Sequence, residues 1–230
     1  LLFVIACTLG LFGTVSAQNV ITIGEGTETA YSIADNYDGH GASQQIYTAA
    51  EVGSAGTITS LAFNKANGAD YNRIWSVYLK NIDEESFTST TNYAMTSADL
   101  VYEGTFHTSN GWNVLDIDDF QYDGRNLLVT VVDNSGYELY GGDQNWYYAF
   151  VYNDSKCLTK YTYQNIDITQ QTSFSAFAGR FNIQLTITAG EGGGEEPTPD
   201  PEPTPDPEPT PEPEPTPDPE KTYIPVKGAT

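Results

Sequence analysis

The sequence predicts an all-β fold: an antiparallel two-sheet β-sandwich with a jelly-roll arrangement, followed by a disordered linker rich in Pro, Glu and Asp. Short stretches alternate apolar and polar residues with the period of a half-buried strand. Clusters of Gly, Asn and Asp separate these stretches, and no helical period persists for about 12 residues. About nine or ten short strands at this spacing are typical of a sandwich.

The predicted strands follow from these patterns in chain order. Residues 180–188, "RFNIQLTIT", show the clearest alternation, and residues 126–133, "NLLVTVVD", are so continuously apolar that they predict a central strand. Proline is absent from residues 18–190, as expected where strand interiors need every backbone donor. The full set of predicted strands is 19–23, 57–63, 73–79, 100–106, 112–117, 126–133, 147–152, 158–164 and 180–188.

The connections are predicted from Gly- and Asn-containing segments, such as "DGHG", "NGAD" and "DNSG". Only "DEESF" (83–87) and "SADL" (97–100) suggest helix, each of a turn or two. Residues 18–190 are enough for one domain that buries roughly 70% of the surface of its unfolded chain. After removal of the leader, Cys157 is the one cysteine, and we expect it to be a small buried apolar residue.

Residues 1–17 are uncharged and apolar, and end in the small residues of a secretory signal peptide with cleavage after Ala17. A competing interpretation is a lipid anchor on Cys7, because "VIAC" resembles the box before a lipidated cysteine. The apolar stretch continues beyond Cys7, which favours plain cleavage. No segment is long and apolar enough to predict a membrane span. We therefore expect a secreted or cell-surface protein.

Residues 191–220 form the predicted linker, a Gly-rich joint followed by an acidic Pro-rich run. Proline at nearly every second position removes backbone donors and fixes φ, so this run should stay extended. Residues 221–230 regain apolar side chains and predict the start of a truncated further domain. Downstream domains of the same chain are therefore expected partners of the β-sandwich. The alternative is an acidic tail that ends there.

Charge limits the partners of the chain. The net charge is −22, and residues 191–230 hold eleven acidic residues and two lysines, which leaves −13 for the rest. Such a surface repels phosphate backbones and anionic lipid, so we expect no nucleic-acid partner. A glycan or a host or cell-surface protein remains a suitable partner.

Four segments carry a resemblance to a known class of domain. They are "SQQIYTAAEVGSAGTITSLAF", "RIWSVYLKNIDEESF", "VYEGTF" and "GWNVLDIDDFQYDGRNLLVTVVDNSG", which fall in order within residues 43–136. Together they resemble an N-terminal module of secreted, multidomain surface proteins of Bacteroidetes. The resemblance implies a β-sandwich joined by linkers to immunoglobulin-like, adhesin or peptidase domains and exported to the cell surface. It implies no catalytic residue.

Catalysis finds little support in the sequence. His40 and His107 are the two histidines, and both stand beside turn residues, where we expect a solvated loop or edge position. No nucleophile elbow or HExxH motif is present. The sequence therefore predicts a non-catalytic recognition or adhesion module. The alternative is an accessory domain of a secreted hydrolase, a peptidase or glycosidase, whose catalytic domain lies beyond the linker.

Binding is suggested by residues 135–148, "SGYELYGGDQNWYY". Aromatic rings stack on sugar rings while amides and carboxylates bind hydroxyls, so this segment predicts a glycan platform. The alternative is that Trp146 and its neighbours begin a buried strand. The hypothetical ligand-binding residues are Tyr137, Tyr140, Asp143, Asn145 and Trp146.

A calcium site is the only cofactor hypothesis. Asp116, Asp118 and Asp119 in "DIDDF" offer the hard oxygen ligands that Ca²⁺ needs. The segment lacks the glycine and terminal glutamate of an EF-hand loop. An exposed strand end is the simpler interpretation.

Overall fold

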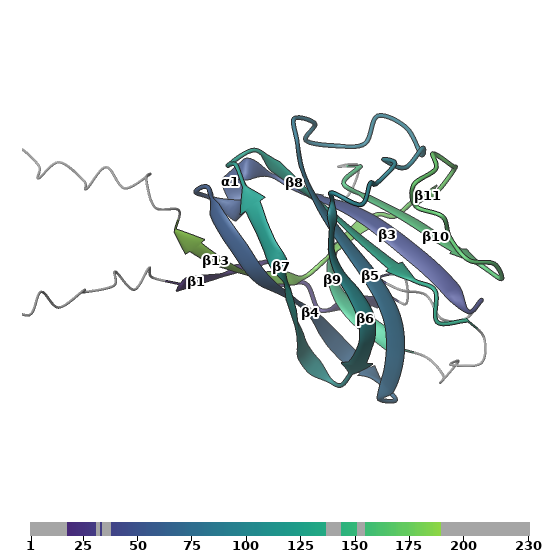
Figure 1. The fold of residues 1–230 in the computed structure, drawn as a ribbon. Coiled ribbons are helices and arrows are strands. Elements are labelled where there is room, and N and C mark those ends of the chain that lie inside the picture. The colour runs from purple at the N-terminus through teal and green to yellow at the C-terminus, as the bar shows by residue number, and fades with distance from the viewer. Residues whose placement is uncertain (1–17, 31–32, 34–37, 137–143, 151–154, 190–230) are drawn as a thin grey trace, which may run out of the picture. The chain divides into compact units, whose positions relative to one another are not determined.

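The computed structural model describes residues 18–30, 33, 38–136, 144–150 and 155–189, and Figure 1 shows their arrangement. The predicted leader, the linker and residues 221–230 lie outside this part of the chain. The described residues form two antiparallel sheets, which confirms the predicted β-sandwich. The chain changes sheet at most of its connections, as a jelly roll does.

The first sheet has six strands, and its centre is almost entirely buried. Strand β8 lies between β3 and β5, and all eight of its residues are buried, so the predicted central strand at 126–133 is confirmed. The order across this sheet is β11 (Ser175–Ala176), β10 (Cys157–Thr162), β3 (His40–Tyr47), β8 (Asn126–Asp133), β5 (Tyr71–Ile82) and β6 (Leu100–Thr108).

The second sheet has seven strands. Its main path is β1 (Gln18–Ile23), β13 (Ile183–Ala189), β4 (Gly56–Gly68), β9 (Gln144–Phe150) and β12 (Gly179–Phe181). Strand β7 (Gly111–Tyr122) also pairs with β4, and β2 (Glu28–Ala30) pairs with β9. The strand predicted over 180–188 is confirmed in its buried alternation, but it is divided into β12 and β13 at Asn182. The side-chain amide of Asn182 exchanges hydrogen bonds with the backbone of Gly26.

Strand β3 was not among the predicted strands, because its sequence, "HGASQQIY", is too polar to show an apolar period. All eight of its residues are nevertheless buried. Gln44 explains how, since its side-chain amide exchanges two hydrogen bonds with the backbone of Tyr93, at 2.9 and 2.8 Å, and donates a third to Thr130. A polar side chain with this many partners can be buried without loss of hydrogen bonding.

The one described helix, α1 (Ala49–Val52), was also not predicted. It begins with a capping box, in which the Glu51 carboxylate accepts from the backbone N–H of Thr48 at 2.8 Å. The two segments that suggested helix, 83–87 and 97–100, form bends and turns instead. Both are too short to repay the cost of helix nucleation without packing.

The main core fills the space between the two sheets. Trp75, Phe63 and Phe106 form its aromatic centre, with ring centroids 6.5 and 5.0 Å from Trp75. Cys157 belongs to this core with no exposed surface, which confirms its predicted role as a buried apolar residue. A buried ion pair lies beside it, in which Arg73 Nε donates to Asp133 at 2.6 Å.

A second apolar cluster lies on the outer face of the six-stranded sheet. Its centre includes Ile46, Leu128 and Leu158, and two long connections, 83–99 and 163–174, cover them. The two connections are joined by backbone hydrogen bonds, for example from Met95 N to Ile168 O at 3.0 Å. The two connections form hollows on the outer face, and the candidate functional site is one of these hollows.

Candidate functional site

A pocket of about 250 Å³ lies on this outer face between β10 and the 163–174 connection. Seven of its eight lining residues carry hydroxyl, amide or charged groups, and Ile166 is the eighth. We call it the β10 pocket. It is lined by Lys160, Thr162, Gln164, Asn165, Ile166, Asp167, Gln170 and Thr172.

Strand β10 positions the first two of these residues. Lys160 pairs with Ala42 of β3, which belongs to the outer apolar cluster, so the side chain of Lys160 projects toward the outer face. Lys160 Nζ donates to Thr172 Oγ1 at 3.0 Å and lies 5.7 Å from the centroid of the Phe174 ring. These contacts hold the ammonium group at the wall of the pocket.

The 163–174 connection is attached to the six-stranded sheet at Asn134 and has an internal turn at Asp167. Asn134, just after β8, accepts from Ile166 N at 3.0 Å and donates to Ile166 O at 3.2 Å. Asp167 accepts from Thr169 N and Thr169 Oγ1 through a single carboxylate oxygen, Oδ1, at 3.0 and 2.6 Å. The polar groups of the pocket are therefore set on a fixed backbone.

Two exposed tyrosines belong to the same segment. Tyr161 and Tyr163 are 55% and 72% exposed, and Tyr161 alternates along β10 with the pocket residues Lys160 and Thr162. The prediction of a strand over 158–164 included both tyrosines but assigned them no role. Because Lys160 and Thr162 line the pocket, this alternation places Tyr161 on the opposite face of β10.

Two smaller hollows, of about 170 Å³ each, lie around the 87–93 part of the other connection. Gln171 lines one of them, whereas the neighbouring Gln170 lines the β10 pocket. This pair of adjacent amides offers a matched comparison between two surfaces of the same loop.

The predicted glycan platform falls mostly outside the described residues, which include neither Tyr137 nor Tyr140 nor Asp143. Asn145 and Trp146 have a described backbone in β9, where they pair with Asn67 and Lys65 of β4. Both residues therefore lie within the seven-stranded sheet. The role of their side chains stays a prediction.

The three aspartates of the calcium hypothesis lie along β7, an edge strand of the seven-stranded sheet. Asp116, Asp118 and Asp119 are all exposed, and Asp116 pairs with Ser60 beside an irregularity in the β4–β7 register. Within the described ranges, no group of three or more His, Cys, Asp or Glu residues is placed to hold a metal ion. Charged side chains on an edge strand discourage pairing with another sheet, which accounts for these aspartates.

The two histidines differ from one another. His107 is exposed on the edge strand β6, as expected, with Nδ1 3.0 Å from Asn72 Oδ1. The expectation of a solvated position is wrong for His40, which is only 9% exposed at the start of the central strand β3. Its Nδ1 lies 3.3 Å from Asn134 Oδ1, so each imidazole has a side-chain amide as its neighbour.

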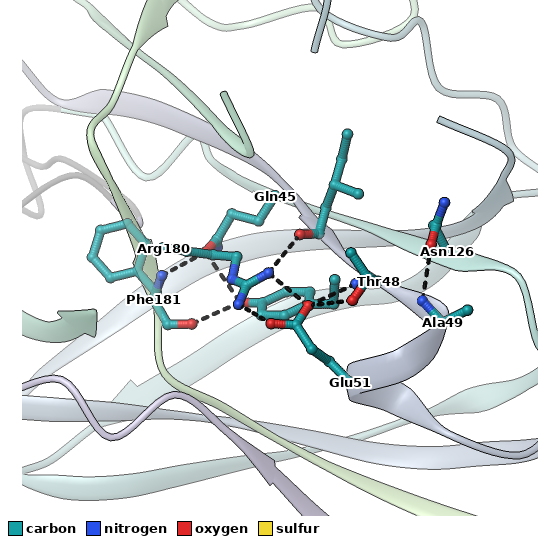
Figure 2. Close-up of polar contacts among 9 residues, drawn as sticks. Gln45, Thr48, Ala49, Glu51, Asn126, Arg180 and Phe181 are labelled. Atoms are coloured by element: carbon teal, nitrogen blue, oxygen red, sulfur yellow. Dashed lines mark hydrogen bonds and ion pairs between the residues drawn. The ribbon is translucent and has the colours of Figure 1, made fainter. Parts of the chain in front are cut away.

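A second polar cluster connects the two sheets near α1 (Figure 2). Arg180 of β12 forms an ion pair with Glu51 of α1, donates to Ile46 O at 3.1 Å, and lies over the ring of Tyr47. Tyr47 in turn donates to Phe181 O at 2.8 Å. We call these residues the Arg180 link.

Electrostatics within the Arg180 link stabilise the charged form of Glu51. Partial burial would raise the pKa of its carboxyl, but hydrogen bonds from Arg180 and Thr48 outweigh burial and lower the pKa to about 2. Burial raises the pKa of Tyr47 far above its usual range, although the charge of Arg180 opposes this shift. Both groups therefore keep one protonation state at neutral pH, which suits a structural role.

Comparisons with known protein families, with curated proteins and with solved structures found no match. Within the described part of the chain, no helix has the length and apolar character needed to cross a bilayer.

Proposed function

We propose that this domain is a non-catalytic recognition or adhesion module of a secreted or surface-displayed protein, and that it binds a glycan in the β10 pocket. The composition of that pocket carries the proposal. Its wall offers the amides of Gln164, Asn165 and Gln170 and the hydroxyls of Thr162 and Thr172. Such groups donate and accept hydrogen bonds in the way that sugar hydroxyls require.

The size and support of the pocket agree with this proposal. At about 250 Å³, it is smaller than the roughly 300–1,000 Å³ of pockets that enclose drug-sized ligands. It therefore suits one end or branch of a glycan, with the remainder in solvent. Binding groups on strands and anchored loops are held more accurately than groups on free loops, and the β10 pocket is built on both.

The setting of the domain supports display outside the cell. The leader has the composition of a signal peptide, and the acidic Pro-rich run has the composition of an extended spacer. The resemblance to modules of Bacteroidetes surface proteins points the same way. A second candidate function is accessory domain of a secreted peptidase or glycosidase, which requires a further domain after the spacer, where apolar residues resume at 221–230.

The Gln170→Ala variant tests the proposal against Gln171→Ala as its control. Both changes remove one exposed amide from adjacent positions, but only Gln170 lines the β10 pocket. The full chain is applied to a panel of immobilised neutral and acidic polysaccharides. We expect Gln170→Ala to weaken retention about 3- to 10-fold, the effect of one lost hydrogen bond, and Gln171→Ala to leave it unchanged.

The melting temperatures of both variants should stay equal to that of the parent, because each amide is exposed. Failure of the parent to bind any member of the panel would contradict the proposal. Equal losses in the two variants would show that the β10 pocket is not the binding site.

A further inference from the structure

We infer that the glycan bound by the β10 pocket carries a carboxylate, as uronic and sialic acids do, and that Lys160 is the residue that binds it. This inference rests on the proposed function and specifies its ligand class. The ionic partners of the cationic side chains provide the first argument.

Cations in this acidic protein are mostly paired with carboxylates. A nearby carboxylate is easily found where acidic residues are in such excess, and the described ion pairs illustrate this. They are Lys65–Asp70, Arg73–Asp133, Lys80–Asp99, Arg125–Asp83, Arg125–Asp123 and Arg180–Glu51. Lys160, in contrast, forms no ion pair with any described carboxylate. Its charge is thus available to a ligand.

The ammonium group of Lys160 is held in one position by contacts with neighbouring side chains. Of its three N–H donors, one bonds Thr172 Oγ1, and the Phe174 ring lies beneath it. Thr172 itself lines the pocket, so the remaining donors stand at the pocket wall. An ammonium in this position binds a carboxylate by charge-assisted hydrogen bonds, which are about twice as strong as neutral ones.

The other charged group of the pocket limits the ligand to a weakly charged one. Asp167 also lines the pocket, and only its Oδ1 is used by Thr169. Its other oxygen can accept from a sugar hydroxyl but repels additional negative charge. With one cation, one anion and a net charge of −13 on the domain, a single carboxylate among hydroxyls fits better than a doubly charged phosphate.

The experiment compares acidic saccharides with their methyl esters, which keep the sugar rings and remove the charge. Binding of trigalacturonic acid, a hyaluronan tetrasaccharide and sialyllactose to the full chain is measured by titration calorimetry. We expect at least one acid to bind about 10- to 100-fold more tightly than its ester, since a hydrogen bond to a charged group contributes that much. The affinity of that acid should also decrease when NaCl is raised from about 50 to about 500 mM.

Two variants assign the effect to Lys160. Lys160→Gln should lower the affinity for the acid to that for the ester and abolish its salt dependence. Lys160→Arg should keep both the tight binding of the acid and its salt dependence. Lys80→Gln is the matched control, because Lys80 lies on β5 and is paired with Asp99, so its neutralisation should leave binding unchanged.

The outcomes separate this inference from the proposed function. Equal affinity for acids and esters would overturn the inference and leave glycan binding intact. This comparison uses only the parent protein, so it does not depend on the folding of a variant. Equal effects of Lys160→Gln and Lys80→Gln would overturn the assignment to Lys160. Absence of binding to every acid and ester would overturn the inference, while the panel of neutral and acidic polysaccharides decides the proposed function separately.

Discussion

Replacing Glu51 with glutamine tests whether the Arg180 link holds the two sheets together. Arg180 is nearly buried, with 9% of its side chain exposed, and the Glu51 side chain is 30% exposed. Removing one partner of a fully buried pair destabilises by about 3–5 kcal/mol, whereas an exposed pair contributes about 0–1 kcal/mol. This intermediate pair should contribute about 2 kcal/mol. Glutamine can still close the capping box, so the loss belongs to the ion pair.

Urea unfolding of the full chain, followed by tryptophan fluorescence, measures the change. We expect the free energy of unfolding to fall by about 2 kcal/mol and the melting temperature by about 4–8 °C. Asp83→Asn is the control, because it neutralises a carboxylate whose ion pair with Arg125 is exposed on both sides. A Glu51→Gln variant that unfolds at the same urea concentration as Asp83→Asn would refute the structural role of the link.

Acid provides a second test of the same carboxylate. The pKa of Glu51 is lowered from 4.5 to about 2 in the folded protein, so its contribution is complete above pH 4.5 and is lost as the pH falls toward 2. The parent and Glu51→Gln should therefore differ in stability at pH 6 and converge near pH 2. A difference that stays constant over this range would contradict the lowered pKa.

Further predictions concern the core and the edge strand. Asp133→Asn leaves the buried guanidinium of Arg73 without its carboxylate, and urea unfolding should show a loss of about 3–5 kcal/mol; a loss below about 1 kcal/mol would contradict it. Gly56→Ala places a Cβ 2.5 Å from Thr188 O, while at Gly104 the nearest atom is 3.5 Å away. Thermal unfolding should show a clear loss of stability only for the former, and equal melting temperatures would refute the close approach. Millimolar Ca²⁺ should leave the melting temperature unchanged, because the three aspartates of β7 are exposed on an edge; a rise would restore the calcium hypothesis.

The parts of the fold that were predictable are those in which apolar residues repeat along the strand. Strand β8 is apolar at nearly every position and proved central, since a strand buried on both faces needs no polar side. The capping box of α1, Thr48 followed by Glu51, was not used to predict a helix. Its helix is so short that no periodic pattern drew attention to it.

Strand β3 was not predictable because its burial depends on distant partners. Gln44 is acceptable in the interior only because the backbone of Tyr93, in a connection 49 residues away, bonds its amide. The same holds for His40, which is buried beside Asn134. Sequence patterns record the polarity of a side chain but not the partners that the fold supplies.

The candidate site was missed for a related reason. Lys160 stands in a predicted strand like any other polar residue, and its significance arises from the ion pairs that other cations make and it does not. The composition of "NIDITQQT" (165–172) is that of an ordinary polar loop. Bonds from distant residues, such as those of Asn134 to Ile166 and of Met95 to Ile168, hold this loop in the shape that forms the pocket.

The most direct measurement of the central claim is amide chemical-shift mapping of the labelled domain during titration with the tightest-binding acidic saccharide. We predict that the largest shifts fall within residues 160–172, and that Lys160→Gln needs about 10- to 100-fold more saccharide to produce them. Shifts concentrated at residues 137–148 would place the glycan on the aromatic segment instead, and would contradict the assignment of recognition to the β10 pocket.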